Sequence, residues 1–527
     1  MPVATLDRQG CAEDASEDEF SRTGPAMHLR RAVITAAGQR RRGHPLQRLV
    51  DRQGEERSAV AIIVDEAIEA GAEEIAIVVN DGEESAFVAA IDRRPGRLEL
   101  IPQRGPSGYG AAVVLARGFV DDEPFLHFVG DHLYVSDVAR CCARQLVDTA
   151  RRESCAVSAV QPTRESMLPW FGAVGGRRVP HVEGLYEIEA VLEKPTPTLA
   201  EQELLVPGLR AGHYLCFFGM HVLTPTIFDL LAPVEGAGQR TMSEALGELA
   251  QRERYLYPLM QGEKRSCFAM TEPAPGVGSD PRMLSSRAER TSAGWTLHGH
   301  KWFASAASIA DFAIVMARTG AGPSMFLVET RQPGFRIVRD VPTMESFDLG
   351  GHAEIRLEAC EVGEDALLGE EGRGLEQAQL RLEGARLFHC MRLIGLSSRA
   401  MALAQDYALG RESHGAKLSE HQMVQAMVAD AHIDLHAARL MTVDTAKRLD
   451  AGLPIRHQSA MTKVFVSEAV NRVADAAVQI TGALGISEDL PLSMIQRFLR
   501  PFRIYDGASE VHRAAIARRV FHKGLQA

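Results

Sequence analysis

The chain has few cysteines, few aromatic residues and no long apolar runs. Its 527 residues include eight cysteines, which are scattered without Cys-x-x-Cys pairs or zinc-ligand spacing. This pattern excludes a zinc ribbon and predicts reduced, mostly structural thiols. No apolar run reaches the roughly 18 residues of a membrane-spanning helix, and no basic-then-apolar signal pattern opens the chain. We therefore expect a cytoplasmic protein with no membrane partner.

Basic residues are outnumbered by acidic ones. The 58 lysines and arginines against 69 aspartates and glutamates give a net charge of −11. Because phosphate backbones are bound by clustered basic side chains, this balance argues against a nucleic-acid partner. Acidic residues are concentrated in residues 1–27, which we expect to be a disordered tail. The length predicts several domains.

Residues 28–255 alternate strand-like and helical patterns. The apolar runs "RAVITAAG", "EEIAIVVN" and "PFLHFVGD" are separated by segments with helical spacing. This alternation predicts a parallel sheet with helices on both faces and ligands at the carboxyl ends of its strands. Asp131 follows one such strand, where a carboxylate can hold a divalent metal against phosphates. The alternative is that Asp131 caps a helix beginning near Ser136.

Residues 28–255 contain four motifs that occur in this order: "RAVITAAG", "IPQRGPSGYGAAVVLAR", "VGDHLY" and "EKP". On these motifs, residues 28–255 resemble the UTP–glucose-1-phosphate uridylyltransferase family. The resemblance implies a Rossmann-like α/β nucleotidyltransferase domain that binds UTP or a UDP-sugar. By position, the nucleotide would be held by Ala37, Gly38, Gln103 and Gly108. Asp131 would bind Mg²⁺, and Glu193 with Lys194 would face the sugar phosphate.

Departures from that family affect its chemistry. The loop continues "GQRRRGHPLQRLV", without the family's second glycine or its following lysine, and "EKRSCF" stands where the last metal carboxylate is due. Nucleotidyl transfer depends on positioning and charge neutralisation. We therefore expect this domain to be degenerate.

The second half of the chain has a different pattern. Residues 256–372 are rich in strand-like runs punctuated by glycine and proline, which predicts a β-domain. Residues 373–527 carry long helical patterns with wide apolar faces, as in an antiparallel bundle.

The ordered motifs "CFAMTEP", "GSD", "KWFAS", "QITGALG" and "RIYDGASEVHR" resemble the acyl-CoA dehydrogenase family over about residues 255–522. The resemblance implies FAD, with an acyl-CoA as substrate and an electron-transfer flavoprotein as electron acceptor. By position, the flavin would be bound by Met270, Thr271, Ser279, Trp302 and Ser305. Arg411, Gln479 and Gly482 would bind the FAD of a neighbouring subunit, which implies a homo-oligomer.

The family's catalytic base precedes the glycine of a Tyr-Glu-Gly motif, which here reads Tyr505-Asp506-Gly507. By this match Asp506 would remove the α-proton of a thioester while a hydride leaves for flavin N5. The alternative is structural, since Asp-Gly is a common turn dipeptide.

We thus expect an FAD-dependent, acyl-CoA dehydrogenase-like oxidoreductase fused to a degenerate nucleotidyltransferase-like domain. The helical domain that opens the dehydrogenase family is not recognised, because residues 28–255 read as an α/β sheet. One alternative is an active sugar nucleotidyltransferase with an inactive flavin half. Another is a non-catalytic fusion in which both halves are incomplete.

Overall fold

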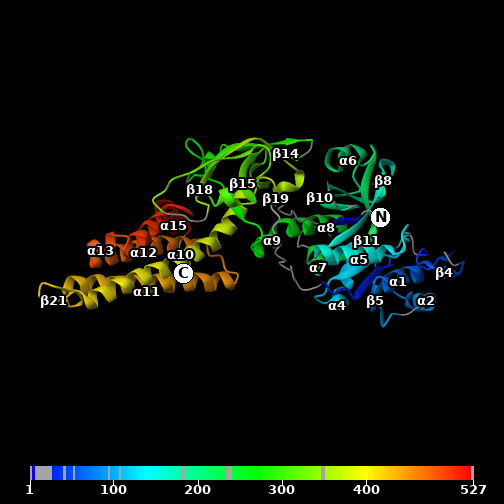
Figure 1. Ribbon diagram of the computed structural model, residues 1–527, viewed down its shortest axis with the longest axis horizontal. Helices are drawn as coiled ribbons and strands as arrows, with labels where there is room; N and C mark the ends of the chain where they lie inside the picture. Colours follow the sequence, from blue (N-terminus) through cyan, green and yellow to red (C-terminus); the bar gives the residue numbers. More distant parts are fainter. Residues whose placement is uncertain are drawn as a thin grey trace, which may run out of the picture. The chain divides into compact units, whose positions relative to one another are not determined.

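The computed structural model describes residues 3–5, 27–38, 43–51, 54–92, 95–105, 108–180, 182, 184–232, 240–278, 280–292, 294–345 and 350–523. It divides into two compact units, Met1–Lys264 and Arg265–Ala527 (Figure 1). Among these residues no helix combines the length and the apolar character needed to cross a membrane.

The N-terminal unit is built on a sheet whose described strands follow the order β6-β5-β2-β7-β11-β8-β1-β10-β9. The strands are β1 (Val3–Thr5), β2 (Arg31–Thr35), β5 (Glu74–Asn80), β6 (Arg97–Gln103), β7 (Phe125–Val129), β8 (Val157–Arg164), β9 (Gly172–Arg178), β10 (Leu185–Glu193) and β11 (His213–Leu223). A small hairpin joins β3 (Arg48–Val50) to β4 (Glu56–Ser58). As predicted, β2 runs parallel to β5 and β7, and β5 runs parallel to β6.

The prediction of a parallel sheet is wrong for most of the remaining strands, although β1 runs parallel to β10. Strand β11 is antiparallel to β7 and β8, and β9 is antiparallel to β10. Residues 179–184 join β9 to β10, and so short a connection cannot provide the crossover of roughly a dozen residues that parallel strands need. Strand β1 lies within the segment expected to be a disordered tail, and it pairs with β8 and β10. Residues 6–26 of that tail lie outside the described residues.

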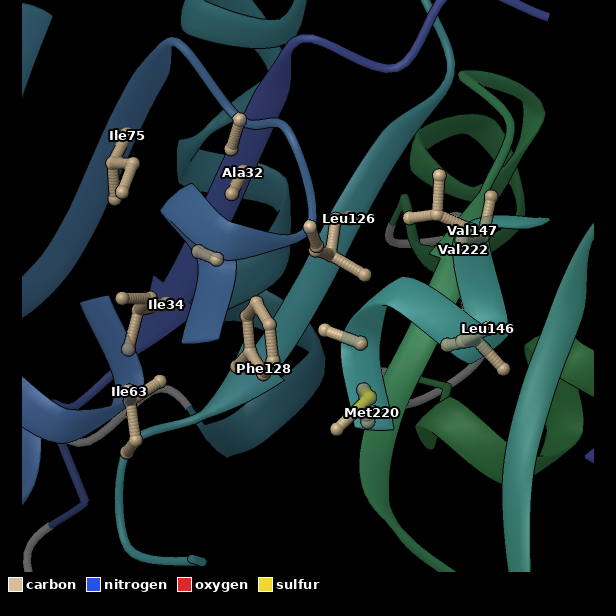
Figure 2. Close-up of a cluster of buried hydrophobic side chains, with 14 of the residues drawn as sticks. Ala32, Ile34, Ile63, Ile75, Leu126, Phe128, Leu146, Val147, Met220 and Val222 are labelled. Carbon is tan, nitrogen blue, oxygen red and sulfur yellow. The ribbon is translucent and has the colours of Figure 1, made fainter. Parts of the chain in front are cut away.

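Helices cover both faces of the sheet, as predicted. They are α1 (Ala59–Glu69), α2 (Glu84–Ala90), α3 (Gly108–Leu115), α4 (Arg117–Val120), α5 (Cys142–Glu153), α6 (Pro197–Glu203), α7 (Thr226–Leu231), α8 (Met242–Gln251) and α9 (Tyr257–Met260), with a π-helical turn at Arg252–Leu256. Side chains of β2 alternate between the faces. Ile34 packs with Ile63 of α1 and Leu146 of α5 in one core (Figure 2), whereas Val33 joins Leu246 of α8 in another.

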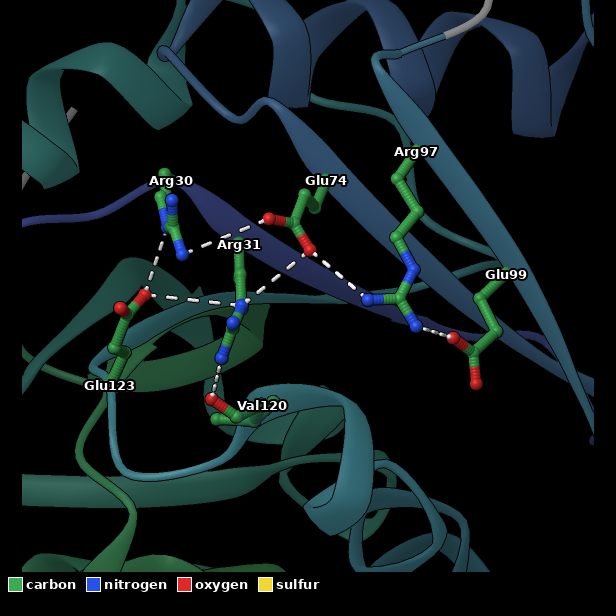
Figure 3. Close-up of polar contacts among 7 residues, drawn as sticks. All are labelled: Arg30, Arg31, Glu74, Arg97, Glu99, Val120 and Glu123. Atoms are coloured by element: carbon green, nitrogen blue, oxygen red, sulfur yellow. Dashed lines mark hydrogen bonds and ion pairs between the residues drawn. The ribbon is translucent and has the colours of Figure 1, made fainter.

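Charged side chains join the amino-terminal ends of the parallel strands (Figure 3). Glu74 lies 3.7 Å from Arg31 and 3.5 Å from Arg97, which connects β5 to β2 and β6. Arg30 adds a contact of 3.2 Å to Glu123, just before β7. This network links the four strands at their amino-terminal ends.

The C-terminal unit begins with a β-domain. Its strands are β12 (Ser266–Ala269), β13 (Arg287–Thr291), β14 (Gly294–Ser305), β15 (Phe312–Thr319), β16 (Gly322–Glu329), β17 (Phe335–Asp340), β18 (His352–Val362) and β19 (Leu367–Leu368). They follow the order β17-β18-β14-β13-β15-β16-β19, and β12 pairs in parallel with β15. Most buried residues of β14, β15 and β18 share one core, whereas Met316 of β15 belongs to another.

Long helices follow, as predicted: α10 (Gly374–Gly410), α11 (Gln422–Asp450) and α12 (Arg456–Thr481), which lie side by side (Figure 1). Shorter elements complete the unit: the hairpin of β20 (Glu412–Ser413) and β21 (Ala416–Lys417), α13 (Ala483–Ile486), α14 (Leu492–Leu499) and α15 (Ser509–Lys523). Short connections make α11 antiparallel to α10 and to α12. The carboxyl ends of α10 and α12 therefore lie at the same end of the bundle.

Candidate functional site

In the N-terminal unit, the strand order reverses between β2 and β7, because β5 and β6 lie beyond β2 while β11 and β8 lie beyond β7. Ligands of open α/β sheets bind at such a point, outside the carboxyl ends of the strands. Ala37 and Gly38 follow β2, and Asp131 follows β7. The two strand ends approach closely, since a Cβ atom on Gly130 would lie 2.9 Å from Cβ of Ala36.

Beside this point lies a cavity of about 430 Å³. Its lining includes Gly108, Tyr109, His132, Trp170, Phe171, Glu193, Lys194, Arg240 and Ser243. Three residues named from the sequence, Gly108, Glu193 and Lys194, thus share one cavity. Gln103 is buried at the end of β6, where its amide donates to the Gly108 carbonyl over 3.4 Å.

The carboxylate of Glu193 is held on two sides. One oxygen accepts a hydrogen bond of 2.6 Å from the Ser243 hydroxyl, and the other lies 2.9 Å from the Lys194 ammonium. Tyr109 lines the same cavity and is 38% exposed.

Asp131 is not the cap of the following helix, because α5 begins at Cys142 and has Cys141 as its N-cap. One oxygen of Asp131 lies 3.3 Å from Nδ1 of His132. Among the residues that the structure describes, no group of three or more His, Cys, Asp or Glu side chains could hold a metal ion. The role of Asp131 as a Mg²⁺ ligand stays a prediction.

In the C-terminal unit, Met270 and Thr271 follow β12 and are fixed against β14. The Thr271 carbonyl accepts a hydrogen bond of 3.0 Å from the Trp302 backbone N–H, and the Met270 carbonyl accepts one of 3.2 Å from the Lys301 ammonium. Met270 also packs in a cluster with Ala378 of α10. The predicted flavin-binding strand end and Trp302 are therefore neighbours.

Ser305 closes the same strand. Its exposed hydroxyl lies 2.9 Å from Nδ1 of His352, whose Nε2 lies 2.9 Å from Glu345. Ser279, the other hydroxyl predicted to contact the cofactor, lies outside the described residues. Thr271, Trp302 and Ser305 together offer hydroxyl, amide and indole groups and no charge.

Asp506 lies between α14 and α15 with a left-handed backbone, at φ of 55°. Its carbonyl accepts hydrogen bonds of 2.9 Å from Nε of Arg386 and 3.1 Å from His512, and the Gly507 carbonyl accepts one of 2.6 Å from Lys463. Burial lowers the pKa of Lys463 to about 8, although the charge of Asp506 acts in the opposite direction. Side chains from three helices thus hold this main-chain segment.

The carboxylate of Asp506 faces a histidine. Its Oδ2 atom is buried without a hydrogen bond and lies 3.2 Å from Nε2 of His389. Burial lowers the pKa of His389, against the opposing charge of Asp506. Burial also raises the pKa of the neighbouring Tyr505 to about 12. Asp506 is therefore held by its backbone, and the cationic side chains of Arg386 and Lys463 contact the same segment.

The residues predicted to bind the FAD of a neighbouring subunit lie away from Asp506, at one end of the helical bundle: Arg411, Gln479 and Gly482. Arg411 caps the carboxyl end of α10, and Gln479 and Gly482 end α12 at the same end of the bundle. At about 1.5 Å per helical residue, Arg411 is roughly 33 Å along α10 from His389. The residues predicted to bind the cofactor therefore form two separate groups within one chain.

Several residues at these sites were missed from the sequence. They are Tyr109, His132, Arg240 and Ser243 in the first unit, and Glu272, Lys301, Arg386, His389, Lys463 and His512 in the second. Five of them lie within motifs quoted from the sequence, which were the available signals: Tyr109 in "IPQRGPSGYGAAVVLAR", His132 in "VGDHLY", Glu272 in "CFAMTEP", Lys301 in "KWFAS" and His512 in "RIYDGASEVHR". The other five lie outside the quoted motifs.

Comparison with known proteins places the second unit in a family. The acyl-CoA dehydrogenase middle domain matches residues 267–360, and the acyl-CoA dehydrogenase C-terminal domain matches residues 372–521. Acyl-CoA dehydrogenase family member 11 of Gallus gallus is 34% identical over 313 residues, which is 57% of this chain and 40% of the relative. The chain thus spans less than half the length of that relative.

A second relative is covered more fully. "Probable acyl-CoA dehydrogenase FadE2" of Mycobacterium tuberculosis is 36% identical over 306 residues, which cover 56% of this chain and 74% of the relative. The crystal structure of glutaryl-CoA dehydrogenase from Mycobacterium smegmatis superposes with a TM-score of 0.50 at 27% identity, covering 53% of this chain and 70% of that one. This chain belongs to the acyl-CoA dehydrogenase family.

Proposed function

We propose that the C-terminal unit is an acyl-CoA dehydrogenase-like oxidoreductase that acts on the CH–CH bond of an acyl thioester, with Asp506 as the base. The observation that carries this proposal is the Asp506 carboxylate, which has a buried oxygen without a hydrogen bond on a backbone held from three helices. A general base needs a fixed position and an oxygen able to take a proton. A turn residue needs neither.

The residues around Trp302 fit FAD. The isoalloxazine ring is flat and carries amide-like edges, so it suits an aromatic wall beside neutral donors such as those of Thr271 and Ser305. Met270 packs against a cluster that includes Ala378 of α10, and the Asp506 carbonyl contacts α10 at Arg386, roughly 12 Å further along the helix axis. When bound there, the flavin would supply the hydride acceptor. Asp506 would hold the α-proton, while Met270 and Trp302 would orient the ring and exclude water.

The distant group at the bundle end supports a homo-oligomer. Arg411, Gln479 and Gly482 lie too far from Asp506 to contact a flavin ring in the same site, so a role in FAD binding requires another subunit. An electron-transfer flavoprotein would then reoxidise the cofactor. The proposal therefore includes two protein partners, a second copy of this chain and an electron-transfer flavoprotein.

Flavin content tests it directly. The purified full chain is expected to show flavin absorbance or to gain it on addition of FAD, and acyl-CoA thioesters of several chain lengths should bleach that absorbance without oxygen. A chain that neither contains nor binds FAD would refute the proposal.

For the N-terminal unit we propose a degenerate sugar-nucleotidyltransferase-like domain that binds UTP or a UDP-sugar. The supporting observation is the cavity beside the carboxyl ends of β2 and β7, which gathers Gly108, Glu193 and Lys194. No transfer step is assigned to a metal in this domain. UDP-glucose should raise the melting temperature, since a ligand that binds only the folded state stabilises it.

The same assays separate the alternatives. Release of pyrophosphate from UTP and glucose 1-phosphate with Mg²⁺, in a chain that binds no FAD, would favour an active nucleotidyltransferase with an inactive flavin half. Absence of stabilisation by FAD, UTP and UDP-glucose together would favour the non-catalytic fusion.

A further inference from the structure

Ser305 and His352 lie opposite each other on strands β14 and β18. The Ala306 N–H donates to the Gly351 carbonyl over 3.0 Å, and the Val341 N–H donates to the His352 carbonyl over 2.7 Å. Ser305 and His352 therefore form a non-hydrogen-bonded pair of the ladder, the kind in which opposite side chains approach most closely. Oγ of Ser305 accordingly lies 2.9 Å from Nδ1 of His352.

A carboxylate holds the far side of the His352 ring. Nε2 of His352 lies 2.9 Å from Oε1 of Glu345, and both side chains are largely buried. The Thr343 hydroxyl donates to the main-chain carbonyl of Glu345 over 3.1 Å, and the ring of Phe303 lies 5.9 Å from the imidazole. The imidazole is thus held at both of its nitrogens, between Ser305 and Glu345.

The two contacts determine where the ring proton lies. An ionised carboxylate can only accept hydrogen bonds, so a neutral His352 carries its proton on Nε2, facing Glu345. Nδ1 then presents its lone pair and accepts the hydroxyl proton of Ser305. The exposed oxygen of Ser305 turns lone pairs towards its surroundings, while its main-chain N–H points away from β18 and is the donor of this residue.

Glu345 also lies near the segment that carries Asp506. Burial raises the pKa of Tyr505 to about 12, and the charge of Arg392 opposes this change. The negative charges of Asp506 and Glu345 both add to it. Because such charge effects weaken with distance, the contacts of Ser305 extend to the region of the proposed base.

We propose that His352, held by Glu345, is a positioning residue that makes the Ser305 hydroxyl a hydrogen-bond acceptor towards the flavin. This inference rests on the proposed function, in which Ser305 lies beside the cofactor. The N5 edge of a flavin carries an N–H only in its reduced form. An acceptor at that edge therefore favours reduction, whereas a hydroxyl donor would favour the oxidised form. His352 itself neither gains nor loses a proton in this role.

The flavin reduction potential of the full FAD-loaded chain tests the role. In His352→Phe the Ser305 proton loses its acceptor and can turn towards the cofactor. The equilibrium should then shift about 2- to 10-fold towards oxidised flavin, since one hydrogen bond contributes a free energy of this order. A tenfold shift lowers the potential of a two-electron couple by about 30 mV. His352→Asn places a carbonyl oxygen where Nδ1 lies and should restore the potential.

A matched control comes from the same two strands. Nε2 of His300 lies 2.7 Å from Oε1 of Glu354, so His300→Phe loses a histidine–carboxylate contact of the same kind and should keep the wild-type potential. In a Ser305→Ala background, His352→Phe should no longer change the potential, because the hydroxyl that it reorients is absent. An unchanged potential in His352→Phe alone, an equal shift in His300→Phe, or a shift that persists without the Ser305 hydroxyl would overturn the inference.

A readout that needs no cofactor is NMR of the full-length protein with ¹⁵N-labelled histidine. The signals lost in His352→Phe identify the His352 ring, which at pH 8.5 should show the tautomer protonated on Nε2. A ring protonated on Nδ1, or one that exchanges between both tautomers, would overturn the inference. If wild type neither contains nor binds FAD, the proposed function fails, and the tautomer alone decides whether His352 holds Ser305 in this way.

Discussion

Nζ of Lys301 lies 2.7 Å from Oε1 of Glu272, and both side chains are fully buried in the C-terminal unit. Backbone and hydroxyl donors of Ser285 and Ser286 complete the contacts of the carboxylate. Burial alone would raise the pKa of Glu272, but attraction and hydrogen bonding by Lys301, with the serine donors, lower it to about 2. The pair joins the end of β12 to β14, directly beside Thr271 and Trp302.

Removal of one charge from this pair should be costly. Glu272→Gln leaves the Lys301 ammonium buried without a counter-charge, a change that costs about 3–5 kcal/mol. Hydrogen exchange at the amides of β12 and β14 would measure the loss. Glu376→Gln breaks the exposed 2.6 Å contact to Arg373 and should cost less than about 1 kcal/mol. Equal costs would contradict the stabilising role of the buried pair.

Acid should destabilise the N-terminal unit through His221. Burial lowers the pKa of this residue to about 3, so the folded state stays unprotonated while the unfolded chain takes up a proton near pH 6.5. The contribution of the neutral His221 to the free energy of unfolding is fully present above pH 6.5. It falls by about 1.4 kcal/mol per pH unit as the pH drops towards 3.

His221→Gln should make that slope shallower in unfolding experiments between pH 4 and 7, followed through amide exchange in β7 and β11. His127 is also buried with a lowered pKa, so part of the slope should remain. The exposed His44→Gln is the control and should leave the slope unchanged. An identical slope in His221→Gln would show that His221 is not responsible.

Asp506→Asn should abolish most flavin reduction by acyl-CoA while FAD content stays the same. Loss of a general base costs about 10²- to 10⁴-fold in rate. The matched control is Glu510→Gln, an exposed carboxylate of the same "YDGASEVHR" motif, which should retain wild-type rates. Stopped-flow absorbance of the flavin measures both, and comparable losses in the two variants would exclude Asp506 as the base.

Gly172→Ala should disturb the cavity of the N-terminal unit. A Cβ atom at this position would lie 2.2 Å from the Ser243 hydroxyl, which holds Glu193. We expect a loss of about 1–3 kcal/mol in stability from overpacking and weaker stabilisation by UDP-glucose. Gly118→Ala on α4, where the new Cβ has open space, should change neither quantity.

The sequence predicted the architecture of much of the chain because periodicity and apolar runs report burial directly. The strands around Ile34 and the long helices from Gly374 were predictable in this way. Strand direction was not, since a run such as "CAVSAVQP" reads the same in either direction. The antiparallel direction of β11 against β7 and β8 depends on how segments far apart in the chain pack together.

The sequence by itself determined the family and the residue types at its motifs, including Asp506, Met270 and Trp302, because these occur in short contiguous phrases. Only the tertiary structure decided which side chains meet. His389 lies far from Asp506 along the chain, and Lys301 lies far from Glu272, so no local pattern contains either contact. Such pairs form when separate elements pack together, and the burial that accompanies packing is also what changes their electrostatics.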